Sequence, residues 1–292
     1  MVAVAADPEI AGGAREARRA RAGRRATGTG PLHWWAPGLL VGLTLVLVVA
    51  PVLLGPGERD VVGAPFTDPL DGHLLGTDGQ GGQPARPQAE DQAGEHVPAL
   101  AVIGIGVVIG AVVGLAAGFA GGWLDTVLMR VTDAALAVPG PLVALAVAAA
   151  LGAGLRNTLL AVAATWWPWY ARIVRGQVVA LVNRPHVEAA RLGELGRVRT
   201  AVVHVLPGTV GPVVVAASLD VGAVMLVLAG LSFLGLGSPA PAAELGAMTA
   251  QGMTYLFNAP WVAIVPAAGL FGLAVLANLA GDGLRDLVAE HQ

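Results

Sequence analysis

Residues 98–120 read PALAVIGIGVVIGAVVGLAAGFA, a run of 23 residues without a charged side chain. The hydrocarbon core of a bilayer is about 30 Å thick, so a helix needs about 20 mostly apolar residues to cross it. Five further segments reach or approach this length. We therefore expect about six transmembrane helices, near residues 36–54, 98–120, 131–153, 157–179, 209–231 and 261–281. The sequence predicts an all-α polytopic membrane protein.

The composition agrees with that fold class. Hydrophobic residues make up 55% of the 292 residues and charged residues only 13%, against about 25% charged residues in a typical soluble domain. The formal net charge of −3 provides no general attraction for nucleic acid, so we expect no nucleic-acid partner. The chain has no cysteine, which excludes disulfides, thiol nucleophiles and thiolate metal sites. We expect no cofactor and no bound metal.

The arginines indicate how the helices are oriented, because short cytoplasmic loops of membrane proteins are rich in positive charge. All 17 basic residues are arginines. If the N-terminus lies in the cytoplasm, 14 of them fall on the cytoplasmic side, and only Arg59, Arg86 and Arg156 fall outside. The charge bias therefore predicts an even number of spans, with both termini cytoplasmic, in the plasma or inner membrane.

Four regions follow from these patterns. Residues 1–30 form an arginine-rich cytoplasmic tail that we expect to be disordered. Residues 31–54 contain the first transmembrane helix, which we interpret as uncleaved because no small-residue cleavage site follows it. Residues 55–97 are an acidic linker, rich in Gly and Pro, on the outer side, where the sequence shows no stable fold. Residues 98–286 hold the other spans and a polar cytoplasmic loop at 184–207.

The loop at 184–207 is the most informative polar segment. It contains the sequence Glu188-Ala189-Ala190, then Gly193, and ends on Leu206-Pro207. A helix that starts near Glu188 gains from a carboxylate in its first turn, and its small alanine face suits the groove of a partner. The alternative is a solvated surface helix in which alanine serves helix propensity. On these residues alone, both interpretations stay open.

The same loop resembles the cytoplasmic coupling loop of binding-protein-dependent ABC importer permeases. Further stretches resemble the second permease subunit of dipeptide, oligopeptide and nickel importers, in the same order and spacing. They are HLLGTD at 73–78, GFAGGWLD at 118–125 with Met129, Arg130 and Asp133, WPWYARIVRGQ at 167–177, LSFLGLG at 231–237 and GDGLRD at 281–286. The resemblance covers about residues 73–286.

This resemblance implies a type I ABC importer permease fold and a transport subunit without catalytic residues of its own. It implies four partners in the bilayer or beside it: a second homologous permease, two ATP-binding subunits and an extracytoplasmic substrate-binding protein. The implied docking residues for the ATPase are Glu188, Ala189, Ala190, Gly193, Leu206 and Pro207. The implied cargo is a peptide or a similar small solute. A chain without lysine has no phosphate-binding loop, so ATP hydrolysis must belong to a partner.

The sequence departs from the importer pattern at three places. Residues 79–87 are rich in Gly, Gln and Pro where the family has helix-forming residues. Glu194 stands where the coupling loop normally has its glycine. Leu228 replaces a Glu that often precedes the LSFLG stretch. These departures leave the fold prediction intact but bear on coupling and activity.

Asp220 lies near the middle of the fifth expected span, where an ionisable group costs about 3 kcal/mol. It is a candidate pathway residue, or else a carboxyl that hydrogen-bonds a neighbouring helix. We favour the second interpretation because no intramembrane arginine is available to fix its charge. Two other functions stay open: an ion-coupled secondary transporter, which would need more such carboxylates and an inverted repeat, and an intramembrane hydrolase. The hydrolase is disfavoured because all six histidines fall in tails, loops or span ends.

Overall fold

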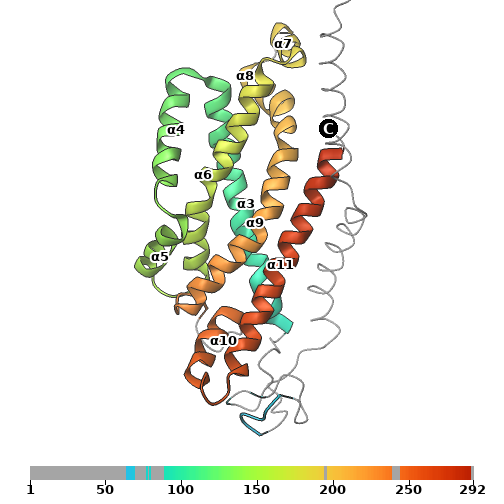
Figure 1. Cartoon of the computed structure of the whole chain (residues 1–292). Coiled ribbons are helices and arrows are strands. Elements are labelled where there is room, and N and C mark those ends of the chain that lie inside the picture. Colours follow the sequence, from blue (N-terminus) through green and yellow to red (C-terminus); the bar gives the residue numbers. More distant parts are fainter. Residues whose placement is uncertain are drawn as a thin grey trace, which may run out of the picture.

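The computed structural model describes residues 64–69, 77, 79, 89–193, 196–238 and 244–290. All regular elements in these ranges are helices (Figure 1). They are α3 (Ala89–Ala120), α4 (Gly122–Leu136), α5 (Gly140–Leu151), α6 (Leu155–Val182), α7 (Pro185–Leu192), α8 (Arg197–Thr200), the π-helix η2 (Ala201–Val205), α9 (Leu206–Phe233), α10 (Leu245–Gly252), the 3₁₀-helix η3 (Met253–Tyr255) and α11 (Trp261–Glu290).

The long helices α3, α6, α9 and α11 run along one axis and form a bundle (Figure 1). At one end of the bundle lie α7, α8 and the C-terminal end of α11, and we call this the α7 end. At the opposite end, the α10 end, lie α5 and α10. Helix α7 projects beyond the long helices (Figure 1).

A row of glycines explains why α3 and α6 pack closely. A Cβ atom added at Gly110 would lie 2.5 Å from the Tyr170 Cβ, and one at Gly114 would lie 2.5 Å from the Ala171 carbonyl oxygen. At Gly118 it would lie 2.8 Å from the Val178 Cγ1. Only residues without a side chain let the two backbones approach this closely. The glycines thus fix the spacing of α3 and α6.

Three described stretches are long and apolar enough to span a bilayer: Val97–Ala120, Arg197–Phe233 and Trp261–Arg285. The pair α4 and α5 gives a fourth if it is taken as one broken span. α6 has the length for a span at 28 residues, but Arg156, Arg172 and Arg175 reduce its apolar character. The expected first span at 36–54 lies outside the described residues, so the count of six remains a prediction.

The expectation of one continuous helix at 131–153 is wrong. The segment is divided between α4 and α5, which meet at an angle of 81°. Pro139 causes the break, because proline lacks a backbone N–H and pushes the residue before it, Val138, out of the helical region. Pro139 itself is extended, with ψ of 119°, and caps the start of α5.

Two features concern the linker expected at 55–97. Helix α3 begins at Ala89, inside that range, so the last nine residues of the expected linker are helical. Thr77 is fully buried, and its carbonyl oxygen accepts a hydrogen bond of 3.2 Å from the Trp261 Nε1 at the start of α11. Part of the linker is therefore packed on the bundle. Most of residues 79–87 lie outside the described residues.

Candidate functional site

Helix α7 presents two of the sequence-predicted docking residues at its surface. Pro185 begins the helix, a position that suits proline because no N–H is needed there. Glu188 and Ala189 are exposed, whereas Val187 is fully buried and Ala190 is 8% exposed. The inner pair anchors α7 to the bundle, and the outer pair stays available to a partner. Ala190 is thus an anchoring residue, not a surface one.

The remaining predicted docking residues follow α7. Gly193 is exposed, and its N–H donates to the Ala189 carbonyl oxygen at 3.0 Å, which closes the last turn of α7. Leu206 is half-buried and Pro207 exposed at the start of α9. The structure therefore gathers all six predicted residues at the α7 end. Glu194, the departure from the glycine of the importer pattern, lies outside the described residues.

A π-helical turn separates α8 from α9, which sequence reasoning missed. Residues 201–205 are π-helical, directly before Leu206 and Pro207. Pro207 lacks an N–H, and its ring would clash with the carbonyl of Val203 in a regular α-helix, so a wider turn accommodates it. The His204 Nδ1 is buried in this turn and has no hydrogen-bond partner among the described residues. Pro207 was the feature of the sequence from which the π-helical turn could have been predicted.

Apolar side chains surround this polar surface. Leu192 is 81% exposed, Val198 78% and Val203 55%. Exposed aliphatic side chains gathered with small residues are typical of surfaces that bind another protein. The α7 end thus carries both the exposed Glu188 carboxylate and exposed apolar side chains.

Asp220 is hydrogen-bonded between helices. The Tyr170 hydroxyl donates to the Asp220 Oδ2 at 2.7 Å, and the Trp166 Nε1 donates to the same oxygen at 3.2 Å. Both donors belong to α6, and Asp220 belongs to α9. Neutral donors stabilise a buried carboxylate without cancelling its charge. This cluster links the two helices that lead to and from α7.

Two ion pairs join α4 to α6. The Arg175 guanidinium donates to Asp125 through Nε and through a terminal nitrogen, each at 2.7 Å, and Arg172 donates to Asp133 at 2.7 Å. All four residues lie in stretches that resemble the importer permeases. Sequence reasoning found the stretches but not their pairing, because the partners are 39 and 50 residues apart.

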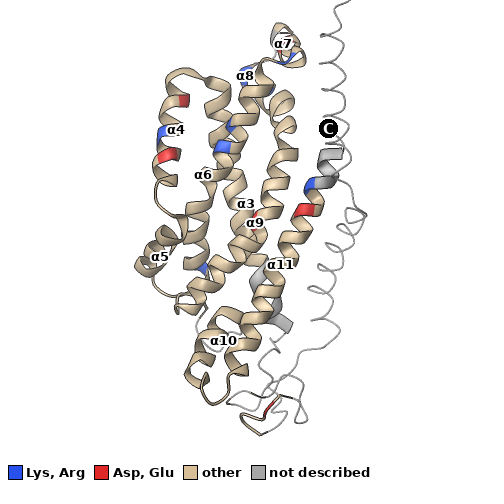
Figure 2. Cartoon of the chain, viewed as in Figure 1, with Lys and Arg blue, Asp and Glu red and all other residues tan. Residues whose placement is uncertain are grey.

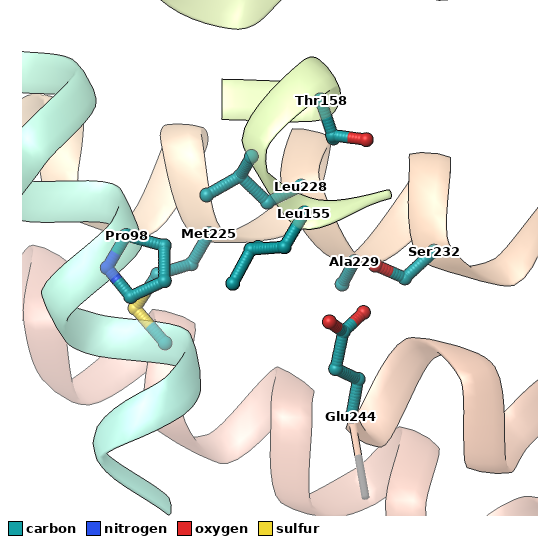
Figure 3. A pocket seen from close by; sticks show the side chains of 8 residues that line it. All are labelled: Pro98, Leu155, Thr158, Met225, Leu228, Ala229, Ser232 and Glu244. Carbon is teal, nitrogen blue, oxygen red and sulfur yellow. The ribbon is translucent and has the colours of Figure 1, made fainter. Parts of the chain in front are cut away.

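A small cavity lies toward the α10 end, between α3, α6, α9 and Glu244 (Figure 3). The Glu244 Oε1 accepts a hydrogen bond of 3.1 Å from the Ser238 N–H. The Glu244 Oε2 is buried without a hydrogen-bond partner among the described residues, and the Ser232 hydroxyl lies near it. Leu228, the third departure from the importer pattern, is buried and lines the same cavity. Its apolar side chain leaves Glu244 as the single carboxylate there.

These helices match a known family. Residues 106–290 match the family described as the binding-protein-dependent transport system inner membrane component. The chain belongs to this family. It is a permease component of a binding-protein-dependent ABC transporter in the inner membrane, and it has no catalytic role of its own. The resemblance inferred from the sequence is confirmed.

Three relatives from Escherichia coli are similar to this permease. The probable D,D-dipeptide transport system permease protein DdpC of strain K12 is 34% identical over 260 residues, which is 88% of this chain and 87% of the relative. The glutathione transport system permease protein GsiD of serotype O6:K15:H31, strain 536, is 42% identical over 182 residues, 62% of this chain and 60% of the relative. The nickel transport system permease protein NikC of strain K12 is 40% identical over 173 residues, 58% of this chain and 62% of the relative.

Proposed function

We propose that this permease forms, with a second homologous permease, the pathway of an ATP-driven importer for peptides or similar small solutes. Its relatives are permeases for a D,D-dipeptide, glutathione and nickel, which supports a small solute as cargo. Two ATP-binding subunits supply the energy, and an extracytoplasmic binding protein delivers the solute. The six-span topology with both termini cytoplasmic belongs to the same proposal.

The ATPase docks on the α7 end. The observation that carries this assignment is the division of α7 into an inner anchoring face, Val187 and Ala190, and an outer face with Glu188 and Ala189. A helix attached in this way transmits a push from a partner because its buried side chains pack into the bundle. The arginines of the loop support a cytoplasmic position for the same end, because short cytoplasmic loops are rich in positive charge, and ATP is available there.

Asp220 serves the pathway in this proposal. It lies inside the longest apolar helical stretch of the described residues, Arg197–Phe233, and carboxylates inside membrane spans mark substrate or ion routes in many transporters. Its hydrogen bonds to Tyr170 and Trp166 join α9 to α6. A carboxylate held in this way moves with α6 and α9, the helices on either side of α7, when they respond to the ATPase.

Co-purification tests the docking surface. A tagged permease is expected to bring down an ATP-binding subunit from native membranes, and Glu188→Arg with Ala189→Arg is expected to release it. These two exposed positions are changed because altering the buried Ala190 would disturb the bundle itself.

A matched control uses the opposite end of the molecule. Phe257 is 97% exposed in the segment between η3 and α11, so Phe257→Arg places an arginine on the surface without touching α7. The control should retain the ATPase. Retention of the ATPase by the Glu188 and Ala189 double variant would refute the proposed docking surface.

A further inference from the structure

Helix α4 is held to the bundle by few apolar contacts. Of its 15 residues, Thr132 is the one that is buried, and its hydroxyl donates to the Leu128 carbonyl of the same helix. Trp123 is 77% exposed and Val131 55%. Membrane helices associate through close packing and interhelical polar contacts. Because so little of α4 is buried, polar contacts are needed to position it.

Neither end of α4 fixes its direction. At its start, Gly121 and Gly122 have φ of 63° and 60°, a left-handed conformation that favours glycine, and open space surrounds both positions. At its end, the break at Pro139 turns the chain by 81° into α5. Hinges are commonly a few residues at element ends that absorb a change in backbone angles, and α4 has such a connection on each side.

The ion pairs supply the missing attachment. Asp125 and Asp133 lie eight residues apart on α4, so they hold the helix at points about 12 Å apart along its axis. Figure 2 shows charged positions on α4 and on the neighbouring part of α6, in the half of the bundle toward the α7 end. The pair Asp125–Arg175 is bidentate and the more sheltered, with side-chain exposures of 19% and 38%, against 54% and 51% for Asp133–Arg172. A bidentate, partly buried pair orients its partners more strongly than a single exposed one.

Arg175 is itself rigidly placed. A Cβ at Gly114 of α3 would lie 2.9 Å from the Arg175 backbone nitrogen, and one at Gly118 would lie 3.1 Å from the Arg175 carbonyl oxygen. Its backbone is therefore in close contact with α3, and the guanidinium extends from this contact to α4. Any displacement of α6 must carry the Arg175 guanidinium with it.

We propose that Asp125–Arg175, supported by Asp133–Arg172, clamps α4 onto α6 so that the two helices move as one unit, while the glycine turn and the Pro139 break absorb the motion. The four residues are positioning residues. The proposal rests on the proposed function in one respect: the movement of α6 originates at α7, which begins three residues after α6 ends. The clamp itself is a property of the permease alone.

Spin labels test the clamp directly. The chain has no cysteine, so Val127→Cys on α4 and Val179→Cys on α6 provide two unique labelling sites, both about half exposed. Electron–electron double resonance then measures the α4–α6 distance in the purified permease and in the importer assembled with its ATPase, nucleotide-free and trapped with ATP and vanadate. We expect one narrow distance distribution, the same in all three samples.

Charge variants show whether the ion pair is responsible. The neutral double variant Asp125→Asn with Arg175→Gln is expected to broaden the distribution without leaving an unpaired charge. The exchanged variant Asp125→Arg with Arg175→Asp restores an ion pair and is expected to narrow the distance distribution again. Asp133→Asn is expected to broaden the distribution less than the neutral double variant does. Unfolding temperatures measured in parallel confirm that each variant is folded.

Two results would overturn the clamp. One is a distance that changes between the nucleotide-free and the trapped importer, since the pair would then open during the cycle. The other is a narrow distribution in the neutral double variant. Failure of the ATPase to bind would contradict the proposed function and leave the measurement on the purified permease to decide the clamp.

Discussion

Asp220 is an ionisable residue in mostly apolar surroundings, and its two hydrogen-bond donors decide what a substitution does. In Asp220→Asn the amide oxygen still accepts from the Tyr170 hydroxyl, so we expect normal assembly. The missing charge is expected to lower uptake about tenfold, the effect of about 1.4 kcal/mol on a barrier. Uptake by membrane vesicles checks this. Unchanged uptake would remove Asp220 from the pathway and leave it the interhelical role favoured by the sequence.

One carboxylate oxygen of Glu244 accepts a hydrogen bond, and the other has no partner among the described residues. Two substitutions at this position are therefore expected to change the stability of the chain differently. Glu244→Gln keeps an acceptor for the Ser238 N–H and places an amide donor near the Ser232 hydroxyl, so we expect an unfolding temperature equal to or above that of the unchanged chain. Glu244→Ala loses the hydrogen bond and enlarges the cavity, which costs about 1–3 kcal/mol. Thermal unfolding in detergent measures both. A less stable glutamine variant would mean that the charge itself is required.

At the scale of the element, the packing of α3 against α6 depends on glycines of α3, which have no side chain at the contact. Gly114→Ala would place a methyl group 2.5 Å from the Ala171 carbonyl oxygen, and such overpacking costs about 1–3 kcal/mol. Gly104→Ala is the matched control, because nothing lies within 4 Å of its Cβ position. We expect the first variant to unfold at a lower temperature and the second to be neutral. Equal stabilities would contradict the role assigned to the glycine row.

The apolar runs predicted α3, α9 and α11 because a membrane helix must satisfy its backbone hydrogen bonds internally and face lipid with apolar side chains. Local sequence also contained the reason for the Pro139 break, but length and hydropathy alone extended the helix through it. The six proposed docking residues were predicted from the resemblance, and their role stays a prediction. Their division into the exposed Ala189 and the buried Ala190 was not predicted, because it depends on how α7 lies against η2.

Contacts between residues far apart in the chain could not be predicted from the sequence. Asp220 was identified from its depth in a span, but its partners Tyr170 and Trp166 are about 50 residues away and follow only from the packing of α6 against α9. The same holds for Asp125 and Arg175. Single-sequence patterns report on neighbours along a helix, whereas these pairs are set by the tertiary arrangement.

At the scale of the whole molecule, the structure connects the α7 end to the bundle through α6. The loop that we assign to the ATPase follows α6 and precedes α9, the two helices joined by the Asp220 cluster. The α10 end holds the packed linker residue Thr77 and the cavity at Glu244. Helices α6 and α9 thus connect the two ends, and we expect them to carry the motion that a transport subunit receives from its energy source.

The energy source is the most direct test of this account. The permease is reconstituted in liposomes with its second permease, ATPase subunits and binding protein, and uptake of a labelled dipeptide, labelled glutathione and radioactive Ni²⁺ is measured. The account predicts that uptake of at least one of these solutes requires ATP on the side of α7 and continues when a protonophore collapses the proton gradient. Uptake that persists without ATP and stops with the protonophore would contradict it and indicate an ion-coupled transporter.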